Sequence, residues 1–258
     1  MQFRPSPTLR RVLSVAACAT GAVLIAGQAQ AAIYSLSGDF SDVSNPNGTW
    51  SFTQGTTALT HHAQPTDGNA ANAAAANGFY GVLADFSRGP FLFKTTEDGS
   101  GVSGYNDGDF LTGDVVAHGT NPGDGADLFI NWTAPTAGLL SFTSAIWYAH
   151  SIVNRSGDVE AILDGLSLGT VTVNNTVNRS NALTTLSGSN FVVAAGDVLS
   201  FRVGPSAGQQ FGTLTGISAT VDFTAAGVVP EPSTWAVMIV GFGMAGGMMR
   251  SRRRLQAA

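Results

Sequence analysis

Hydrophobic and polar positions alternate in short runs through most of the chain, and turn residues separate these runs. Alternation with a period of two is the pattern of a strand with one buried and one solvated face. No stretch keeps a helical period of about 3.6 residues over several turns. The runs predicted as strands are 33–36, 49–53, 91–94, 109–117, 127–132, 138–149, 158–163, 167–173, 191–194, 197–203 and 213–223.

Turn signals between the runs predict how these strands connect. Asp164-Gly165 separates two alternating runs and predicts a tight hairpin, and Gly196-Asp197 predicts a further turn. No internal repeat is visible, which disfavours a solenoid or a propeller. We therefore expect an all-β fold, a single jelly-roll-like β-sandwich over residues 32–227.

Large aromatic residues lie in several predicted strands. The indole rings of Trp50, Trp132 and Trp147 are expected to fill the core, with sugar stacking as the alternative. Trp147 and Tyr148 are adjacent, so one faces the core and the other faces solvent. We expect Tyr148 to face solvent, because its hydroxyl tolerates water and the larger indole fills a core better. Tyr148, Trp132 and Trp147 are accordingly the candidate residues for binding a neutral glycan.

The charge of the predicted sandwich excludes some partners. The region 32–227 holds five of the 12 Lys and Arg residues and 16 of the 17 Asp and Glu residues, a formal charge of −11. Phosphate contacts need cations that displace counterions, so nucleic acid is excluded as a partner. The net negative charge of this region also repels anionic polymers.

The N-terminus has the organisation of a secretory signal peptide. A basic segment precedes an apolar run over 12–26, and small residues follow at Ala29 and Ala31. This order predicts cleavage by signal peptidase after Ala31, so residues 1–31 are a leader. Two alternatives remain: an uncleaved membrane anchor, and acylation of Cys18 within a lipoprotein-like box. Cys18 is the single cysteine of the chain, so a body cut after Ala31 has no disulfide.

The C-terminal segment, residues 228–258, predicts a short membrane span. Residues 235–249 are apolar, about 22 Å long as a helix, which is shorter than a hydrocarbon core of about 30 Å. Arginines fill most of 250–254 and place this end in the cytoplasm by the positive-inside rule. The sandwich is then left outside the inner membrane.

The linear order of this segment resembles the PEP-CTERM sorting signal. The matching positions are Pro230, Glu231 and Pro232 in the box, Trp235 at the start of the span, and Arg250, Arg252, Arg253 and Arg254 behind it. The resemblance implies recognition by an exosortase, a membrane cysteine protease that cuts near the box. It also implies transient anchoring in the inner membrane and release to the surface or extracellular matrix of a Gram-negative bacterium. A plain tail anchor is the alternative.

Three stretches of the body, 39–52, 129–142 and 192–205, resemble a jelly-roll domain that is common in secreted bacterial proteins and often stands beside PEP-CTERM tails. Two departures from that pattern concern a ligand. His118-Gly119-Thr120 stands where His-Pro-Gly is usual, and Phe211-Gly212-Thr213 stands where an Asp is usual. A ligand that relatives hold at those positions would lack its usual partners here.

Stretches that match the spacing of catalytic motifs lack the structural context that the chemistry needs. Gly165 to Gly169 fits the spacing of a hydrolase nucleophile elbow, but that chemistry needs a helix after the turn and the next residues predict a strand. Glu97 and Glu160 are the only glutamates of the body, and no stretch identifies an acid and base pair for glycoside hydrolysis. We therefore expect no enzymatic activity and no cofactor.

Structural calcium is the one metal that the sequence favours. Asp107, Asp109, Asp124 and Asp127 lie in Gly-rich loops and offer the oxygen ligands that a hard cation prefers, although the EF-hand spacing is absent. The alternative is that these residues form solvated turns. Two functions remain: a non-catalytic surface or matrix protein associated with exopolysaccharide or biofilm, and a carbohydrate-binding module with a defined site for neutral glycan.

Overall fold

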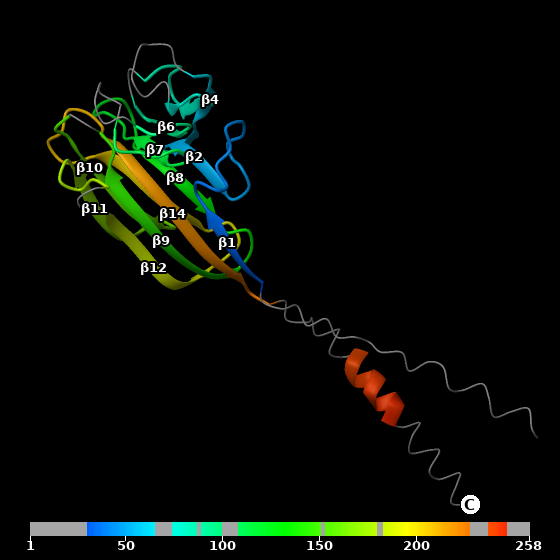
Figure 1. Ribbon diagram of the computed structural model, residues 1–258. Helices are drawn as coiled ribbons and strands as arrows, with labels where there is room; N and C mark the ends of the chain where they lie inside the picture. Colours follow the sequence, from blue (N-terminus) through cyan, green and yellow to red (C-terminus); the bar gives the residue numbers. More distant parts are fainter. Residues whose placement is uncertain are drawn as a thin grey trace, which may run out of the picture. The chain divides into compact units, whose positions relative to one another are not determined.

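The computed structural model describes residues 30–64, 74–86, 89–99, 108–150, 153–179, 183–227 and 237–246. Ala29–Ala226 forms one compact unit, called the body below, and Met1–Gln28 with Gly227–Ala258 forms the other. The body consists of two stacked antiparallel sheets (Figure 1). This arrangement confirms the predicted all-β sandwich.

The larger sheet has eight strands. In spatial order they are β12 (Thr184–Val193), β9 (Gly138–Tyr148), β14 (Leu214–Ala225), β7 (Val115–His118), β6 (Phe91–Lys94), β5 (Phe79–Gly81) and β4 (Thr60–His62), and β1 (Ala31–Ser35) pairs with the C-terminal half of β14. The smaller sheet has six: β11 (Leu166–Asn174), β10 (Ser156–Leu163), β13 (Val198–Pro205), β8 (Leu128–Thr133), β2 (Trp50–Gln54) and β3 (Thr57–Ala58). Neighbours in the sheets are mostly far apart in the sequence.

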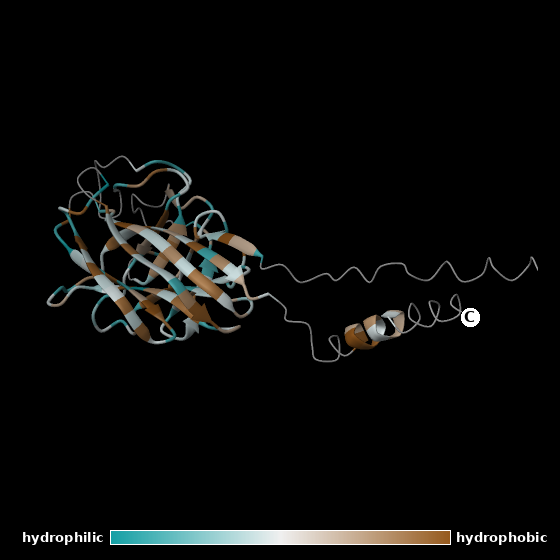
Figure 2. Cartoon of the chain, turned by 90° about the horizontal axis from the view of Figure 1, so that it is seen from below, coloured by the Kyte–Doolittle hydropathy of each residue, from teal (hydrophilic) through white to brown (hydrophobic). Residues whose placement is uncertain are grey.

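The main core fills the space between the sheets, because alternate residues of each strand point inward. Leu140, Phe142 and Ile146 project from β9, and Ile130 and Trp132 project from β8. Figure 2 shows the resulting alternation of hydrophobic and hydrophilic residues along the strands. Full burial of one such side chain contributes about 1.5–3 kcal/mol, so this alternation is the main determinant of the sandwich.

A second core covers the other face of the eight-stranded sheet near one end. Its members come from β5, β6, β7, the end of β9 and the loops beside them: Ala74, Ala75, Phe79, Phe86, Phe91, Phe93, Phe110, Val116, Trp147, Ala149 and Leu214. The rings of Phe86 and Phe91 stack with centroids 4.2 Å apart. Here the large sheet is buried on both faces, and strand alternation no longer separates core from solvent.

The observed strands follow most of the predictions, with three differences. Of the predicted strand 109–117, only the part from Val115 is a strand, because Asp109 to Asp114 form a turned segment. β12 begins at Thr184 rather than Phe191. The strands β3, β4 and β5 were not predicted; each has two or three residues, too few to show a period.

The predicted hairpin at Asp164-Gly165 is present. It joins β10 to β11, and both residues have positive φ, 47° and 80°, as a two-residue hairpin turn requires. The Asp164 side chain accepts a hydrogen bond from the backbone N–H of Val198, at 2.9 Å. That bond links the hairpin to the neighbouring strand β13.

The chain enters and leaves the body at one end, called the base below (Figure 1). Ala31 of β1 lies opposite Thr224 of β14, and the carbonyl of Gln30 accepts a hydrogen bond from the Ala225 N–H at 3.0 Å. Ala31, the predicted last leader residue, is therefore the first residue of β1. β14 runs from the opposite end to the base over 12 residues, about 36 Å at 3.3 Å per residue.

In the other unit, residues 237–246 form a helix of mostly apolar residues (Figure 2). They lie within the predicted span 235–249. Among the described residues, no helix combines the length and the hydropathy needed to cross a bilayer.

Candidate functional site

The three aromatic residues predicted to bind a glycan are buried. Trp132 is 0% exposed, Trp147 is 2% exposed and Tyr148 is 1% exposed. Tyr148 faces the main core and Trp147 faces the second core, so the prediction that Tyr148 faces solvent is wrong. The two side chains do point to opposite faces, but the second core covers the outer one. Burial raises the pKa of Tyr148, and its hydroxyl donates to the carbonyl of Val153.

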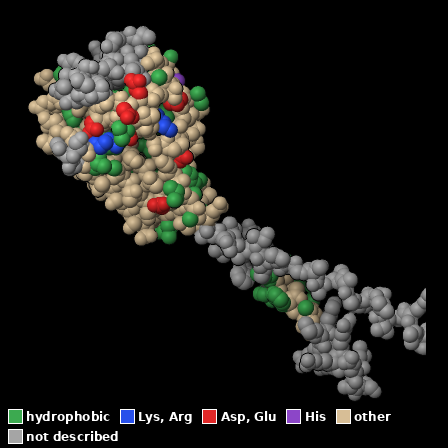
Figure 3. Space-filling model, in the orientation of Figure 1, with side chains coloured by type: hydrophobic (Ala, Val, Ile, Leu, Met, Phe, Trp, Pro, Cys, Tyr) green, Lys and Arg blue, Asp and Glu red, His purple; other side chains and the backbone are tan. Residues whose placement is uncertain are grey.

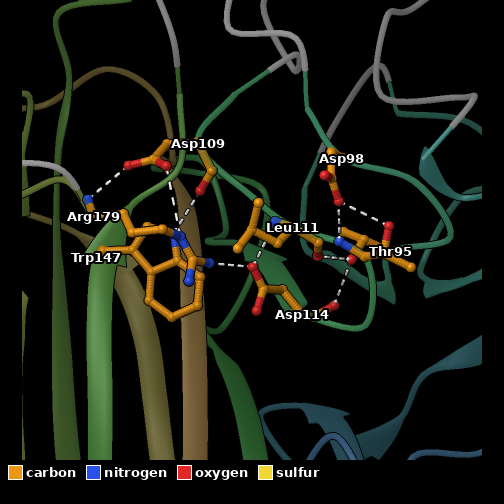
Figure 4. Close-up of polar contacts among 8 residues, drawn as sticks. Thr95, Asp98, Asp109, Leu111, Asp114, Trp147 and Arg179 are labelled. Atoms are coloured by element: carbon orange, nitrogen blue, oxygen red, sulfur yellow. Dashed lines mark hydrogen bonds and ion pairs between the residues drawn. The ribbon is translucent and has the colours of Figure 1, made fainter.

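The ring of Trp147 packs against a network of ion pairs on the outer face of the large sheet (Figure 4). The Arg179 guanidinium lies over its ring, 4.2 Å from the centroid, and the Trp147 Nε1–H donates to the carbonyl of Asp109 at 2.6 Å. Arg179 also pairs with two carboxylates. Its Nε is 3.6 Å from Asp109 Oδ1, and its Nη2 contacts Asp114.

Hydrogen bonds fix the loop that carries these carboxylates. Asp114 accepts the Leu111 N–H at 2.7 Å, and the Thr95 hydroxyl donates to the Leu111 carbonyl at 2.6 Å. Asp98 accepts the backbone N–H and the hydroxyl of Thr112, which lowers the pKa of Asp98. Figure 4 shows the contacts of Arg179 and those of Asp98 side by side, and both sets join another loop to the turned segment before β7. The network therefore holds three separate loops on the second core.

The electrostatics of this network indicate a structural clamp. Partial burial raises the pKa of Asp114, an effect that outweighs the opposing Leu111 N–H and the Arg179 charge. Arg179 is 28% exposed, and its partners Asp109 and Asp114 are 29% and 20% exposed. Both carboxylates share Arg179 as their cation, and each also accepts a backbone N–H, that of Arg179 on Asp109 and that of Leu111 on Asp114.

The structure does not bring the three described calcium candidates together as ligands of one metal ion. Asp109 is paired with Arg179, and Asp127 lies 3.4 Å from Arg202. Asp124 accepts a hydrogen bond from the Asn121 side-chain amide at 3.1 Å. Asp107 lies outside the described residues. Within the described ranges, no three His, Cys, Asp or Glu side chains cluster as metal ligands.

The two segments that depart from the jelly-roll pattern meet at the end of the body opposite the base. The N–H of Gly119 donates to the carbonyl of Thr213 at 3.2 Å. The backbones of Gly119 and Gly212 approach so closely that a Cβ on Gly212 would lie 1.9 Å from the Gly119 carbonyl oxygen. Only glycine fits there. The sequence pattern suggested a ligand position, and the structure shows a tight backbone contact where the neighbouring strands β7 and β14 of the large sheet meet.

His118 is buried directly beneath this contact. Its ring stacks on Phe91 with centroids 5.0 Å apart, and its Nδ1 is 2.7 Å from the Gly119 carbonyl, the geometry of an Nδ1–H donor. Burial lowers the pKa of His118 to about 4, and the nearby positive charge of Arg155 acts in the same direction. The imidazole is therefore neutral at physiological pH.

Above His118, four side chains from three loops form what we call the rim: Asn121, Arg155, Gln209 and Phe211. Arg155 donates to the Gly212 carbonyl at 3.1 Å and lies over the Phe211 ring, 4.7 Å from its centroid. Asn121 accepts the Gly212 N–H at 2.9 Å, and Gln209 accepts the Ser156 N–H at 3.3 Å. Sequence reasoning singled out the segment that contains Phe211, but it missed Asn121, Arg155 and Gln209, because these are isolated positions in three separate connections.

Phe211 is the exposed aromatic residue of the rim. Its side chain is 49% exposed, whereas every other Phe, Tyr and Trp in the described part of the body is buried or half-buried. The arrangement offers a ring surface beside amide and guanidinium groups. The ring can stack against an apolar surface, and the amide groups beside it can hydrogen-bond to neutral polar groups.

Comparison with known proteins assigns the C-terminal segment. Residues 228–254 match the family model of the PEP-CTERM protein-sorting motif, which confirms that resemblance. The chain thus carries the signal of an exported protein that an exosortase processes. The matched range contains the predicted signal residues Pro230, Glu231, Pro232, Trp235, Arg250, Arg252, Arg253 and Arg254, which lie outside the described residues, as does Ala29. No curated protein matches the chain.

Several solved structures resemble parts of the body. The C-terminal carbohydrate-binding module (CBM6) of LamC, a marine laminarinase from Zobellia galactanivorans, has 18% identity and a TM-score of 0.25 and aligns with 42% of this chain and 77% of its own. A cleaved adhesin domain of Lys-gingipain from Porphyromonas gingivalis has 12% identity and a TM-score of 0.29, covering 68% and 91%. A carbohydrate-binding module (CBM36) in complex with calcium and xylotriose has 16% identity and a TM-score of 0.24, covering 46% and 86%. At these scores the likenesses assign no ligand to this chain.

Proposed function

We propose that the chain is a non-catalytic matrix or cell-surface protein of a Gram-negative bacterium, associated with exopolysaccharide in a biofilm. In this proposal, signal peptidase removes the leader, the C-terminal span holds the body at the inner membrane, and an exosortase then cuts near Pro230 to Pro232. The PEP-CTERM motif at 228–254 carries the proposal. The arginines behind the span place the C-terminus in the cytoplasm until the cut is made.

The outer face of the large sheet supports association with neutral polymer. Ser187, Thr143, Thr220 and Ser35 lie in one row across β12, β9, β14 and β1. Figure 3 shows that this face is largely free of charged side chains, which gather toward the end opposite the base. Hydroxyl groups can hydrogen-bond to sugar hydroxyls without the repulsion that the acidic body exerts on anionic polymers.

Intact mass tests the processing step. The full chain is produced in a bacterium with an exosortase and in the same strain without it. We expect the protein recovered from the exosortase strain to lack the terminal arginines, and a variant with Pro230→Ala and Pro232→Ala to retain them. Pro135→Ala, in the turn before β9, is the matched control and should be processed normally. A full-length C-terminus in the exosortase strain would contradict the proposal.

A carbohydrate-binding module with a defined neutral-glycan site is the second candidate. The exposed ring of Phe211 beside Asn121 and Gln209 is the observation that favours it. The two candidates differ in one measurable respect. A defined site loses its affinity when a single side chain is removed, whereas diffuse association with a hydroxyl-rich face does not.

A further inference from the structure

The backbone that presents Phe211 is held rigidly. The neighbouring Gly212 donates to Asn121 and accepts from Arg155, and its close contact with Gly119 leaves no room for a side chain. A single exposed hydrophobic side chain is common and needs no explanation by itself. The Phe211 ring differs, because the adjacent Gly212 is hydrogen-bonded to Asn121 and to Arg155, and the guanidinium of Arg155 lies over one face of the ring. Such preorganisation lowers the entropic cost of binding.

Amide groups of the rim, beside the Phe211 ring, have hydrogen-bond donors that a ligand can use. The Asn121 side-chain N–H₂ has two hydrogens, and Asp124 receives one of them. Gln209 uses its Oε1 to accept from Ser156, and its Nε2 makes no hydrogen bond among the described residues. Two amide donors therefore lie in the same group of loops as an exposed aromatic ring. We propose that the rim binds a neutral polysaccharide, with a sugar ring stacked on Phe211 and its hydroxyls bonded to these amides. This inference rests on the proposed function and names a site for it.

Charge selects among polysaccharides. Asp124 accepts a hydrogen bond from Asn121, and Asp158 of β10 accepts one from the hydroxyl of Ser206, in the loop after β13, at 2.7 Å. Arg155 is a cation of the rim, but the formal charge of −11 over residues 32–227, to which these two carboxylates contribute, disfavours uronate-containing or sulfated chains. A sugar without charged groups avoids that repulsion and still offers an apolar C–H face to the ring.

The position of the rim suits a tethered protein. β14 separates the rim from the base by about 36 Å, and the chain enters and leaves the body at the base. A polymer at the rim therefore does not compete with the leader or the sorting segment for the same end of the body.

Affinity electrophoresis in native gels tests the site. The full chain is purified in a zwitterionic detergent without a sugar headgroup and run through gels containing laminarin, xylan, dextran or galactomannan, with alginate as the anionic comparator. We expect retardation by at least one neutral polysaccharide and none by alginate. Phe211→Ala should weaken that binding at least tenfold, and Phe211→Tyr should retain it. Leu166→Ala is the matched control, because Leu166 is 67% exposed at the base and its loss should leave the affinity unchanged.

Each result distinguishes the rim from the broader function. Binding that persists unchanged in a folded Phe211→Ala protein would overturn the rim and leave association through another surface. No binding to any neutral polysaccharide would overturn the rim and the defined-site function together, while the intact-mass experiment would still decide exosortase processing. Equal thermal unfolding of the three variants and the unaltered chain establishes that folding does not cause the difference.

Discussion

The buried His118 makes the stability of the body depend on pH. Its folded-state pKa is about 4, against an ordinary value of 6.5. Between these two pH values the unfolded chain binds a proton that the folded state does not, so unfolding becomes easier as pH falls. The contribution of the neutral imidazole is complete above pH 6.5 and is lost progressively down to about pH 4. At 1.36 kcal/mol per pH unit, the loss amounts to about 3 kcal/mol.

The variant His118→Asn isolates this effect. Its side-chain amide can replace the Nδ1–H donor to the Gly119 carbonyl but does not titrate. At pH 8 we expect the variant to be less stable by about 1–3 kcal/mol, because it loses the stacking on Phe91 and leaves a small cavity. As pH falls from 6.5 to 4, the free energy of unfolding of the wild type should fall by about 3 kcal/mol relative to that of the variant.

Urea unfolding of the body, Ala29–Ala226, at pH 8, 6.5, 5 and 4 measures the difference. Subtraction of the two curves is essential, since burial raises the pKa of Asp114 and Asp127, and those carboxyls favour the folded state on acidification. Their contributions cancel between wild type and variant. A stability difference that stays constant from pH 6.5 to 4 would refute the reasoning, because it would mean that His118 protonates equally in both states.

Three further measurements test the architecture. Arg179→Met should destabilise the body by about 1–3 kcal/mol in urea, because it leaves two partly buried carboxylates without their cation, and an unchanged midpoint would show that the network contributes nothing. Trp132→Ala should cost about 3–5 kcal/mol by calorimetry, since the ring is fully buried, and a loss below 1 kcal/mol would contradict its place in the core. The body should unfold in one cooperative transition in chelator and reductant, because its core is self-sufficient at this size; failure to fold in chelator would instead support structural calcium.

Local patterns in the sequence determined the fold class and the sorting signal. Alternation along 138–149 and 158–163 predicted strands because each side chain's face depends only on its position in the strand. The Asp164-Gly165 turn followed from backbone preferences of the two residues themselves. The PEP-CTERM segment could be recognised from the sequence, because the signal is defined by the order of the Pro-Glu-Pro box, the apolar run and the arginines along the chain.

Tertiary structure alone decided which surfaces are exposed and which charges are paired. Alternation correctly placed Trp147 and Tyr148 on opposite faces, but the outer face is covered by side chains such as Phe86 and Phe110. The sequence around β9 gives no sign of this cover. Arg179 lies 70 positions from Asp109, so the sequence near Asp109 does not show that this predicted calcium ligand is paired with a cation. The rim arises in the same way. Its four side chains come from three separate connections, and only the antiparallel sheets bring the ends of those strands together.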